Sequence, residues 1–155
     1  MPEDYPKRSP IRLAALLALL AMCGPFTIDA FFPAFGAVAK DLRANDWDMQ
    51  LTISVYLWAN AAMSLFHGPL SDAYGRRRVI LWGVFLFMAS SIGCVFCQTI
   101  EQLWFFRALQ GISTGAGLIV SRAIVRDLYQ GAAAQKVMSL ISMFFSLAPA
   151  VAPIV

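Results

Sequence analysis

The segment GPLSDAYGRRR at positions 68–78 lies between two long apolar stretches and decides how the chain turns between them. Gly68 lacks a side chain, which predicts close packing of two helices, and Gly75 permits the tight reversal of a short loop. Asp72 precedes Arg76 by four residues, a spacing that supports an ion pair if the turn is helical. Alternatively, the three closing arginines serve only to hold the loop on the cytoplasmic side of a membrane. The segment therefore predicts a short, charged turn between two helices.

The composition around this turn is that of a membrane protein. Of 155 residues, 59% are apolar and only 14% are charged, which leaves too little charge to cover a soluble domain. The net charge of +3 comes from short basic clusters between apolar runs, so no nucleic-acid partner is expected. His67 is the only histidine, so no metal cluster is expected. The three cysteines lie inside apolar runs, which argues against a disulfide framework.

Five apolar stretches are long enough to cross a lipid bilayer as helices. About 20 residues, each rising about 1.5 Å, span a hydrocarbon core of about 30 Å. A β-barrel would alternate apolar and polar residues, and the sequence shows no such alternation. The prediction is an all-α integral membrane protein with five transmembrane helices. The expected spans are 13–35, 49–70, 79–99, 103–125 and 137–155.

Lysine and arginine are distributed unevenly between the two ends of these spans. One side collects nine of them, whereas the other side has only Lys40 and Arg43. Because basic residues are enriched in cytoplasmic loops, the N-terminus and the 68–78 turn are placed in the cytoplasm. The last span stops at Val155 without a polar flank. We therefore expect a fragment of a longer protein, or else a short protein that needs partners to complete its bundle.

The 68–78 segment resembles the loop signature of the major facilitator superfamily, G-x-L-x-D-x-x-G-R-[RK]-x, at each of its Gly, Asp, Gly and Arg positions. TIDAFFPA at 27–34 is similar to the end of the first span in drug exporters of the bicyclomycin-resistance (Bcr/CflA) type. RALQG at 107–111 and SRAIVRD at 121–127 resemble parts of their fourth span. PAVAP at 149–153 looks like the start of the antiporter signature in their fifth span. The resemblance covers nearly the whole chain.

This resemblance implies a transporter of about twelve spans in two six-helix halves, of which this chain supplies an incomplete N-terminal half and lacks the C-terminal half. Such a protein lies in the bacterial inner membrane and exports drugs or other small molecules in exchange for protons, by alternating access. No cofactor and no covalent chemistry are implied, so the chain is not expected to be an enzyme. Met63-Ser64 and Arg78 depart from the exporter pattern, which leaves the substrate open.

Two charged residues lie well inside the expected spans. A charge inside a span costs about 2.5 to 3.5 kcal/mol on insertion scales, so Asp29 and Arg107 are expected to face a shared polar cavity. Counting from the helix centres puts them at a similar depth, roughly 8 and 10 Å into the outer half, where they pair directly or through water. A proton-coupled exporter needs an acid that alternates between its ionised and neutral forms, and the resemblance implies a coupling role for Arg107. The alternative is snorkelling to the membrane boundary.

Other residues are expected to gate the transporter and to pack its helices. The resemblance implies a cytoplasmic loop network that latches one conformation, in which Arg126 could bridge to Asp72; a solvated cluster that only sets topology is the alternative. Gly111 and Gly115 have G-x-x-x-G spacing, which predicts the close approach of another helix. The residues of the expected gating loop are Gly68, Asp72, Gly75, Arg76, Arg77, Arg126 and Asp127.

Other functions also fit parts of the sequence. A carrier of sugars, amino acids or metabolites would share the 68–78 signature, although the setting of Asp29 favours drug-type antiport. A short membrane subunit that acts by helix–helix association would require a stop in the gene directly after Val155. A membrane enzyme fits worst, because the spans offer no histidine cluster and no pair of acids for catalysis.

Overall fold

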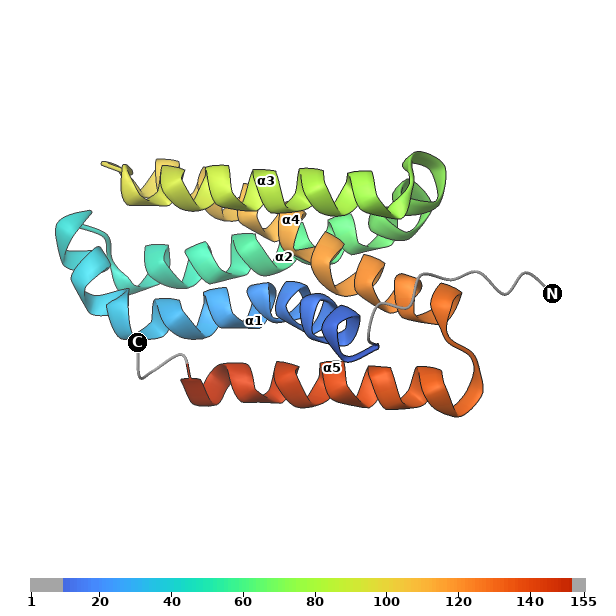
Figure 1. The fold of residues 1–155 in the computed structure, drawn as a ribbon. Helices are drawn as coiled ribbons and strands as arrows, with labels where there is room; N and C mark the ends of the chain where they lie inside the picture. Colours follow the sequence, from blue (N-terminus) through green and yellow to red (C-terminus); the bar gives the residue numbers. More distant parts are fainter. Residues whose placement is uncertain (1–9, 152–155) are drawn as a thin grey trace.

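The computed structural model describes residues 10–151, with side chains described for 15–143. Five helices make up nearly all of the described range, which contains no strand (Figure 1). The all-α class expected from the sequence is therefore confirmed. The helices are α1 (Pro10–Asp41), α2 (Asp46–Tyr74), α3 (Arg76–Val95), α4 (Ile100–Leu128) and α5 (Gly131–Val151).

Three of these helices are long and apolar enough to cross a membrane. The stretches are Ala15–Asp41 in α1, the whole of α3 and the whole of α4. The apolar part of α2 is interrupted by polar residues such as Gln50 and Asn60, which lower its hydropathy. For α5 the described side chains end at Met143, and the end of the fifth expected span, 152–155, lies outside the described residues.

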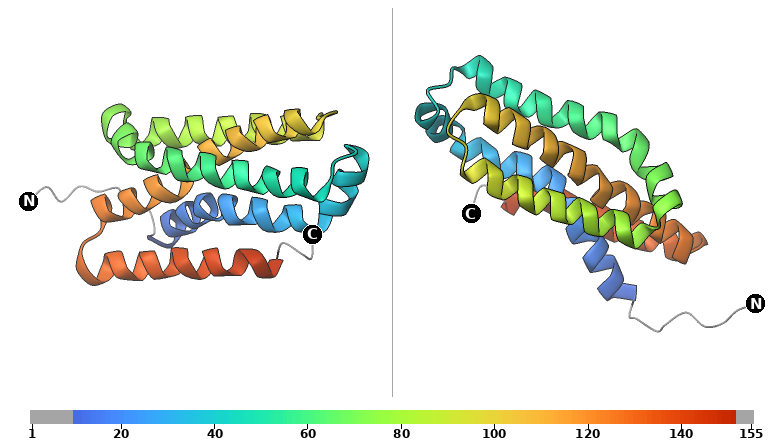
Figure 2. Two further views of the ribbon diagram at one scale, coloured as in Figure 1. Left: turned by 180° about the vertical axis from the view of Figure 1, so that it is seen from behind. Right: turned by 90° about the horizontal axis from the view of Figure 1, so that it is seen from above.

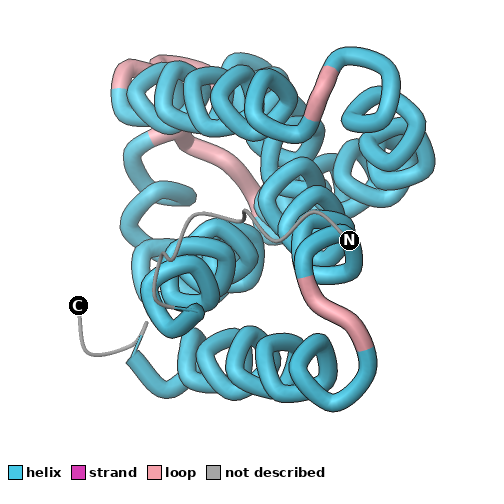
Figure 3. Tube along the Cα trace, turned by 45° about the vertical axis from the view of Figure 1, so that its right-hand side comes forward, coloured by secondary structure: helices cyan, strands magenta, loops and turns pink. Residues whose placement is uncertain are grey.

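Short loops with local hydrogen bonds join the helices (Figure 3). Asn45 caps α2, because its side chain accepts the Asp48 N–H at 2.8 Å while its own N–H donates to the Asp48 carboxylate at 3.2 Å. α3 ends at Val95, earlier than expected, since the following N–H groups turn back to carbonyls within its last turn. A single residue, Gly75, separates α2 from α3, and its φ of 89° suits glycine. The predicted tight reversal is thus confirmed.

α4 is the central helix of the bundle. It packs against each of the other four helices, and most extensively against α2. α2 and α3 lie toward one side of the molecule, α1 and α5 lie toward the other, and α4 crosses obliquely between them (Figures 1 and 2). Residues on several faces of α4 are therefore buried, unlike those of α3, which packs only on α2 and α4 in the described part of the chain.

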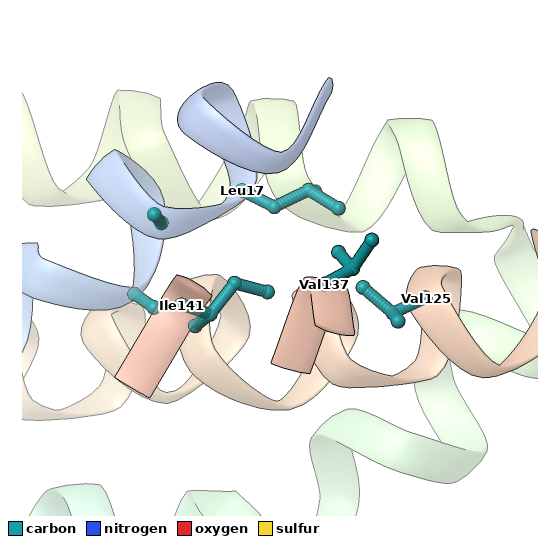
Figure 4. Packing of buried hydrophobic residues seen from close by; sticks show 6 residues of the cluster. Leu17, Val125, Val137 and Ile141 are labelled. Atoms are coloured by element: carbon teal, nitrogen blue, oxygen red, sulfur yellow. The ribbon is translucent and has the colours of Figure 1, made fainter. Parts of the chain in front are cut away.

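Apolar clusters hold the two ends of the bundle together. One cluster joins α1, α4 and α5 (Figure 4) and consists of Leu17, Ala18, Ala21, Val125, Val137 and Ile141. A second lies near the opposite end of α1 and consists of Phe31, Met49 and Leu103. Between these clusters, the contacts of α4 with α1 and α2 include many polar side chains, and this region carries the candidate site.

α1 contains two prolines in its interior, Pro25 and Pro33. Proline lacks an N–H group and its ring crowds the preceding turn, so it bends or breaks a regular helix. In Figure 2 the N-terminal part of α1 turns away from the line of the rest. Pro25 also lines a cavity between α1, α2 and α4, so the bend lies beside the polar region of the bundle.

Candidate functional site

Polar residues of α2 and α4 meet along the interface of these two helices. We call this set the polar seam, and it comprises Thr52, Tyr56, Asn60 and His67 of α2 with Arg107, Gly111, Thr114 and Gly115 of α4. In α2 these residues are spaced by four or seven positions, and in α4 the last three follow Arg107 by four, seven and eight positions, which puts each set on one helix face. Most of them are buried. The largest helix interface in the bundle is therefore polar at its centre.

Two glycines allow the helices of the polar seam to approach closely. A Cβ atom at Gly111 would overlap the backbone carbonyl oxygen of Tyr56. A Cβ atom at Gly115 would lie 3.0 Å from Asn60 Oδ1 and 3.1 Å from His67 Nδ1. Both glycines of the G-x-x-x-G pair thus face α2, where a side chain would push the helices apart.

Arg107 occupies one end of the polar seam and is deeply buried. Only 7% of its surface is exposed, and its guanidinium carbon lies 3.9 Å from the centre of the Phe31 ring. This geometry is a cation–π contact. A small cavity of about 10 Å³ beside Arg107 is lined by Thr52 and Tyr56 among others. The Arg107 Nε has no hydrogen-bond partner, and no ion pair to a carboxylate is found in the described residues.

Asp29 lies between Ile28 and Phe31, the two α1 residues beside Arg107, but it does not pair with Arg107 in the described structure. The preceding residue, Ile28, lines the small cavity beside Arg107, whereas the Asp29 side chain is half-buried on α1. The ion pairs in the described part of the chain involve other residues. The structure therefore brings Phe31, rather than Asp29, into direct contact with the guanidinium.

A larger cavity opens in the middle of the seam between α1, α2 and α4. Its volume is about 220 Å³, and its polar lining includes Tyr56, Asn60, Ser64 and Thr114. The Tyr56 hydroxyl lies 3.1 Å from the Gly24 carbonyl oxygen, to which it donates, and 3.2 Å from Thr114 Oγ1. Asn60 Oδ1 is buried and has no hydrogen-bond partner among the residues with described side chains. A cavity of this size with several polar groups can hold water molecules.

Arg76 organises the loop end of the bundle. Its Nη2 lies 2.7 Å from Asp72 Oδ1, and its Nε donates to Asp127 Oδ2 at 3.0 Å. Its Nη1 donates to Ser71 Oγ at 2.7 Å. Because Asp72 and Ser71 belong to α2 and Asp127 belongs to α4, one side chain at the start of α3 joins three helices. The Asp72–Arg76 ion pair expected from the four-residue spacing is confirmed.

The expected bridge from Arg126 to Asp72 is wrong. In the described residues Arg126 is exposed and makes no ion pair, while Arg76 pairs with Asp72 and with Asp127, the residue after Arg126. Arg126 lines a cavity of about 640 Å³ at this end together with Asp72 and Arg76, but it makes no ion pair across that cavity in the described part of the chain.

Gly68 has a different environment from the one expected. A Cβ atom built at Gly68 meets nothing within 4 Å in the described part of the structure. Close packing against another of these helices is therefore not what requires glycine there. Arg77 is also exposed and makes no ion pair among the described residues, which leaves it outside the Arg76 network.

Sequence reasoning did not assign roles to the central residues of the polar seam. Tyr56, Asn60 and His67 are isolated polar residues in an apolar stretch, and each alone is unremarkable. The four-residue step from Thr52 through Tyr56 to Asn60 was the available signal, since it puts polar groups on one helix face. No cluster of His, Cys, Asp or Glu that would suit a metal ion occurs among the residues with described side chains.

Comparison with known proteins places these features in a family. The family model described as Major Facilitator Superfamily matches residues 17–155. The chain is 43% identical over 143 residues to YdgK of Bacillus subtilis (strain 168), named as an uncharacterized MFS-type transporter, with 92% of this chain and 36% of that protein covered. It is 34% identical over 139 residues to a bicyclomycin resistance protein homolog of Haemophilus influenzae, with 90% and 35% covered. It is 32% identical over 145 residues to multidrug resistance protein D of Escherichia coli K12, with 94% and 37% covered.

The chain spans about a third of the length of these curated relatives. Its relatives are named as transporters and resistance proteins and not as enzymes, in agreement with the expectation from the sequence. The α2–α3 turn with its Arg76 network and the helices that could cross a membrane lie within the matched region, except for the first two residues of the stretch Ala15–Asp41. The chain is an integral membrane protein that belongs to the Major Facilitator Superfamily.

Proposed function

We propose that this chain forms part of a secondary transporter that exports drugs or other small molecules in exchange for protons. In this proposal all five helices cross the bacterial inner membrane, and the N-terminus lies in the cytoplasm. The relatives named for bicyclomycin and multidrug resistance support the drug class of substrate. Substrate would bind near the middle of the membrane, between this part of the protein and the rest of the transporter, and access would alternate between the two sides.

The observation that carries the proposal is the buried charge of Arg107. Arginine stays protonated in proteins, and a buried charge is costly unless other groups compensate it. Here the Phe31 ring supplies a partial compensation, and no carboxylate of the described residues completes it. Arg107 is therefore a fixed positive charge that a carboxylate can approach or leave, which is what coupling to a proton requires.

Asp29 is the acid we assign to this exchange. It follows Ile28, which lines the cavity beside Arg107, and its side chain is half-buried. Pro25 lies one helical turn earlier and weakens the α1 hydrogen-bond ladder there. A small rotation of this part of α1 would change the distance from Asp29 to Arg107. When Asp29 and Arg107 approach each other, the ionised form of Asp29 is favoured. When they separate, Asp29 binds a proton more readily.

The Arg76 network supplies the gate in this proposal. It ties α2, α3 and α4 together at the end of the bundle that we place in the cytoplasm. Breaking and reforming exposed ion pairs of this kind costs little, about 0 to 1 kcal/mol for each pair, which suits a contact that must open in every cycle. The network would favour one conformation without making it permanent.

Transport driven by a pH gradient in membrane vesicles containing the full-length protein tests the proposal. Asp29→Asn removes the acid while preserving its shape, so we expect proton-driven efflux to fall to the level of vesicles without the protein, while drug binding persists. Asp41→Asn is the matched control, because Asp41 is an exposed residue at the end of the same helix. Its efflux should equal that of the wild type.

Unchanged proton-driven export in Asp29→Asn would overturn the role of Asp29. Loss of export in both variants would show that negative charge on α1, and not this acid, is what transport needs. Export of sugars or amino acids by the wild type, with drugs excluded, would instead support a metabolite carrier built on the same helices.

A further inference from the structure

An apolar groove runs along the surface of the bundle between α2, α3 and α4, away from the polar seam cavity. Its volume is about 510 Å³. Tyr74 and Arg78 line the end beside the α2–α3 turn, and Met63, Phe85 and Leu86 line the other end. Trp82, His67 and Ser113 line the part between these ends. The groove therefore has one polar end and one apolar end.

The length of the groove matches one leaflet of a bilayer. At about 1.5 Å per residue, α2 rises about 16 Å from Tyr74 to Met63, and α3 rises about 12 Å from Arg78 to Leu86. Half of a hydrocarbon core is about 15 Å thick. Because the two helices are joined at Gly75, Tyr74 and Arg78 lie at the same end, where a headgroup would be.

The surroundings of the groove are suited to lipid. α3 crosses the membrane and packs only on α2 and α4 among the described helices. Several of its apolar side chains are exposed, including Trp82, Phe85, Met88 and Ile92. Tyrosine prefers the interface between hydrocarbon and headgroups, so Tyr74 is well placed at the polar end.

Arg78 supplies the charge at that polar end. Of the three consecutive arginines, Arg76 is already engaged by Asp72 and Asp127. Arg77 and Arg78 are exposed and make no ion pair in the described part of the chain, but of these two only Arg78 lines the groove. A free guanidinium above an apolar channel is complementary to a phosphate that carries an acyl chain.

We propose that this groove binds an anionic phospholipid, with its phosphate at Arg78 and one acyl chain along Met63, Phe85 and Leu86. The groove shares His67 with the polar seam but shares no lining residue with the cavity at Asn60 and none with the small cavity at Arg107, so the proposal does not depend on the direction or substrate of transport. A bound lipid would brace α3 against α2 at the gate end of the bundle.

Retention of lipid by the full-length protein in detergent, measured by native mass spectrometry, tests this site. The protein is equilibrated with phosphatidylglycerol or phosphatidylcholine of the same acyl chains. We expect preferential binding of phosphatidylglycerol, and Arg78→Gln should weaken it about five-fold, the contribution of one basic residue near a lipid surface. Arg77→Gln is the matched control, because it removes the same charge from the adjacent residue outside the groove, and it should leave the preference unchanged.

A second measurement keeps Arg77 and Arg78 unchanged, so its result does not depend on whether the arginine variants fold. Brominated acyl chains quench tryptophan fluorescence. The contribution of Trp82 is the part of the fluorescence that Trp82→Phe removes. Brominated phosphatidylglycerol should quench this part more than brominated phosphatidylcholine does. Equal weakening by Arg77→Gln and Arg78→Gln would overturn the site in favour of general surface charge. Displacement by soluble glycerol phosphate would show an anion site without an acyl groove. If quenching of Trp82 by brominated lipid falls as the protein concentration rises, a second copy of the protein, and not a lipid, covers the groove.

Discussion

At the scale of single residues, Arg76 shows how one side chain can hold three helices. It lies at the start of α3 and contacts Ser71 and Asp72 of α2 and Asp127 of α4. Asp72 and Asp127 remain substantially exposed, so each ion pair is weak and reversible. The contact is suited to selecting a conformation rather than to stabilising the fold.

Asp72→Asn is therefore expected to loosen the gate without affecting the binding of substrate. The substitution removes one charge from Arg76 but leaves its bonds to Asp127 and Ser71. Distances between spin labels on the full-length protein should show a smaller population of the conformation in which Arg76 joins α2, α3 and α4. The Kd of a transported drug should be unchanged. Asp46→Asn, an exposed acid at the other end of α2, is the control. An unaltered distribution of distances would remove Asp72 from the gate.

The residue contacts differ in how far the sequence could predict them. The Asp72–Arg76 pair was predictable because both residues lie within one turn of chain. The partnership of Arg76 with Asp127 was not, since it depends on how α3 and α4 cross, and the sequence equally allowed Arg126 to face the turn. Arg107 was expected to face a polar cavity and pair with Asp29, and its contact with Phe31 instead reflects the orientation of α1, which no local pattern determines.

At the scale of helices, the α2–α4 interface depends on the absence of side chains at two positions. Gly111 and Gly115 bring the backbones together and bury the polar groups of the seam. Apolar surface gives little driving force between helices in lipid, so close contact and hydrogen bonds carry the association. This interface is consequently sensitive to added volume.

Gly111→Ala is expected to destabilise the bundle. The new methyl group would overlap the Tyr56 carbonyl oxygen, which belongs to the backbone and cannot move aside alone. Overpacking of this kind costs about 1 to 3 kcal/mol. The melting temperature of the full-length protein, followed by fluorescence-detected gel filtration, should fall.

Two alanine controls make this result specific. A Cβ atom at Gly36 in α1 or at Gly68 in α2 meets nothing within 4 Å in the described structure. Gly36→Ala and Gly68→Ala should therefore leave the melting temperature unchanged or raise it, because alanine favours a helix over glycine. A fall of equal size in all three variants would contradict the packing role of Gly111.

The helices themselves were the most predictable part of the fold. Each follows from an apolar stretch of sufficient length, but several boundaries moved: α1 ends six residues later than expected, α5 begins six residues earlier, and α3 ends four residues earlier. The neighbours of each helix were less predictable, because an apolar surface accepts many partners. G-x-x-x-G spacing indicated an interface on α4 without saying which helix fills it, and Gly68 suggested close packing that the described helices do not provide.

At the scale of the whole molecule, the bundle has two charged ends that should lie on opposite sides of the membrane. The α2–α3 turn and the α4–α5 loop share one end with Arg76, Arg122 and Arg126. The α1–α2 loop and the α3–α4 loop share the other. Basic residues concentrate at the first end, which we place in the cytoplasm.

Labelling of single cysteines tests this orientation in intact cells. The native cysteines of this region are replaced first, and cysteine is then placed at the exposed positions Ala73 or Gln98. An impermeant maleimide should label Gln98→Cys directly and Ala73→Cys only after the membrane is opened. The reverse pattern would invert the topology, and labelling of both positions from outside would contradict a crossing by α3.

The central position of α4 has a consequence for biogenesis. α4 contacts all four other helices, carries buried Arg107 and offers α2 a polar face, yet it leaves the ribosome after α1, α2 and α3. Those three nascent segments have few contacts with one another, so they must wait in or beside the translocon until α4 arrives. Release of α4 into lipid alone would expose its guanidinium to hydrocarbon. We therefore expect partitioning of α4 from the translocon to be cooperative with α2, and folding of this region to be completed only after most of it has been synthesised.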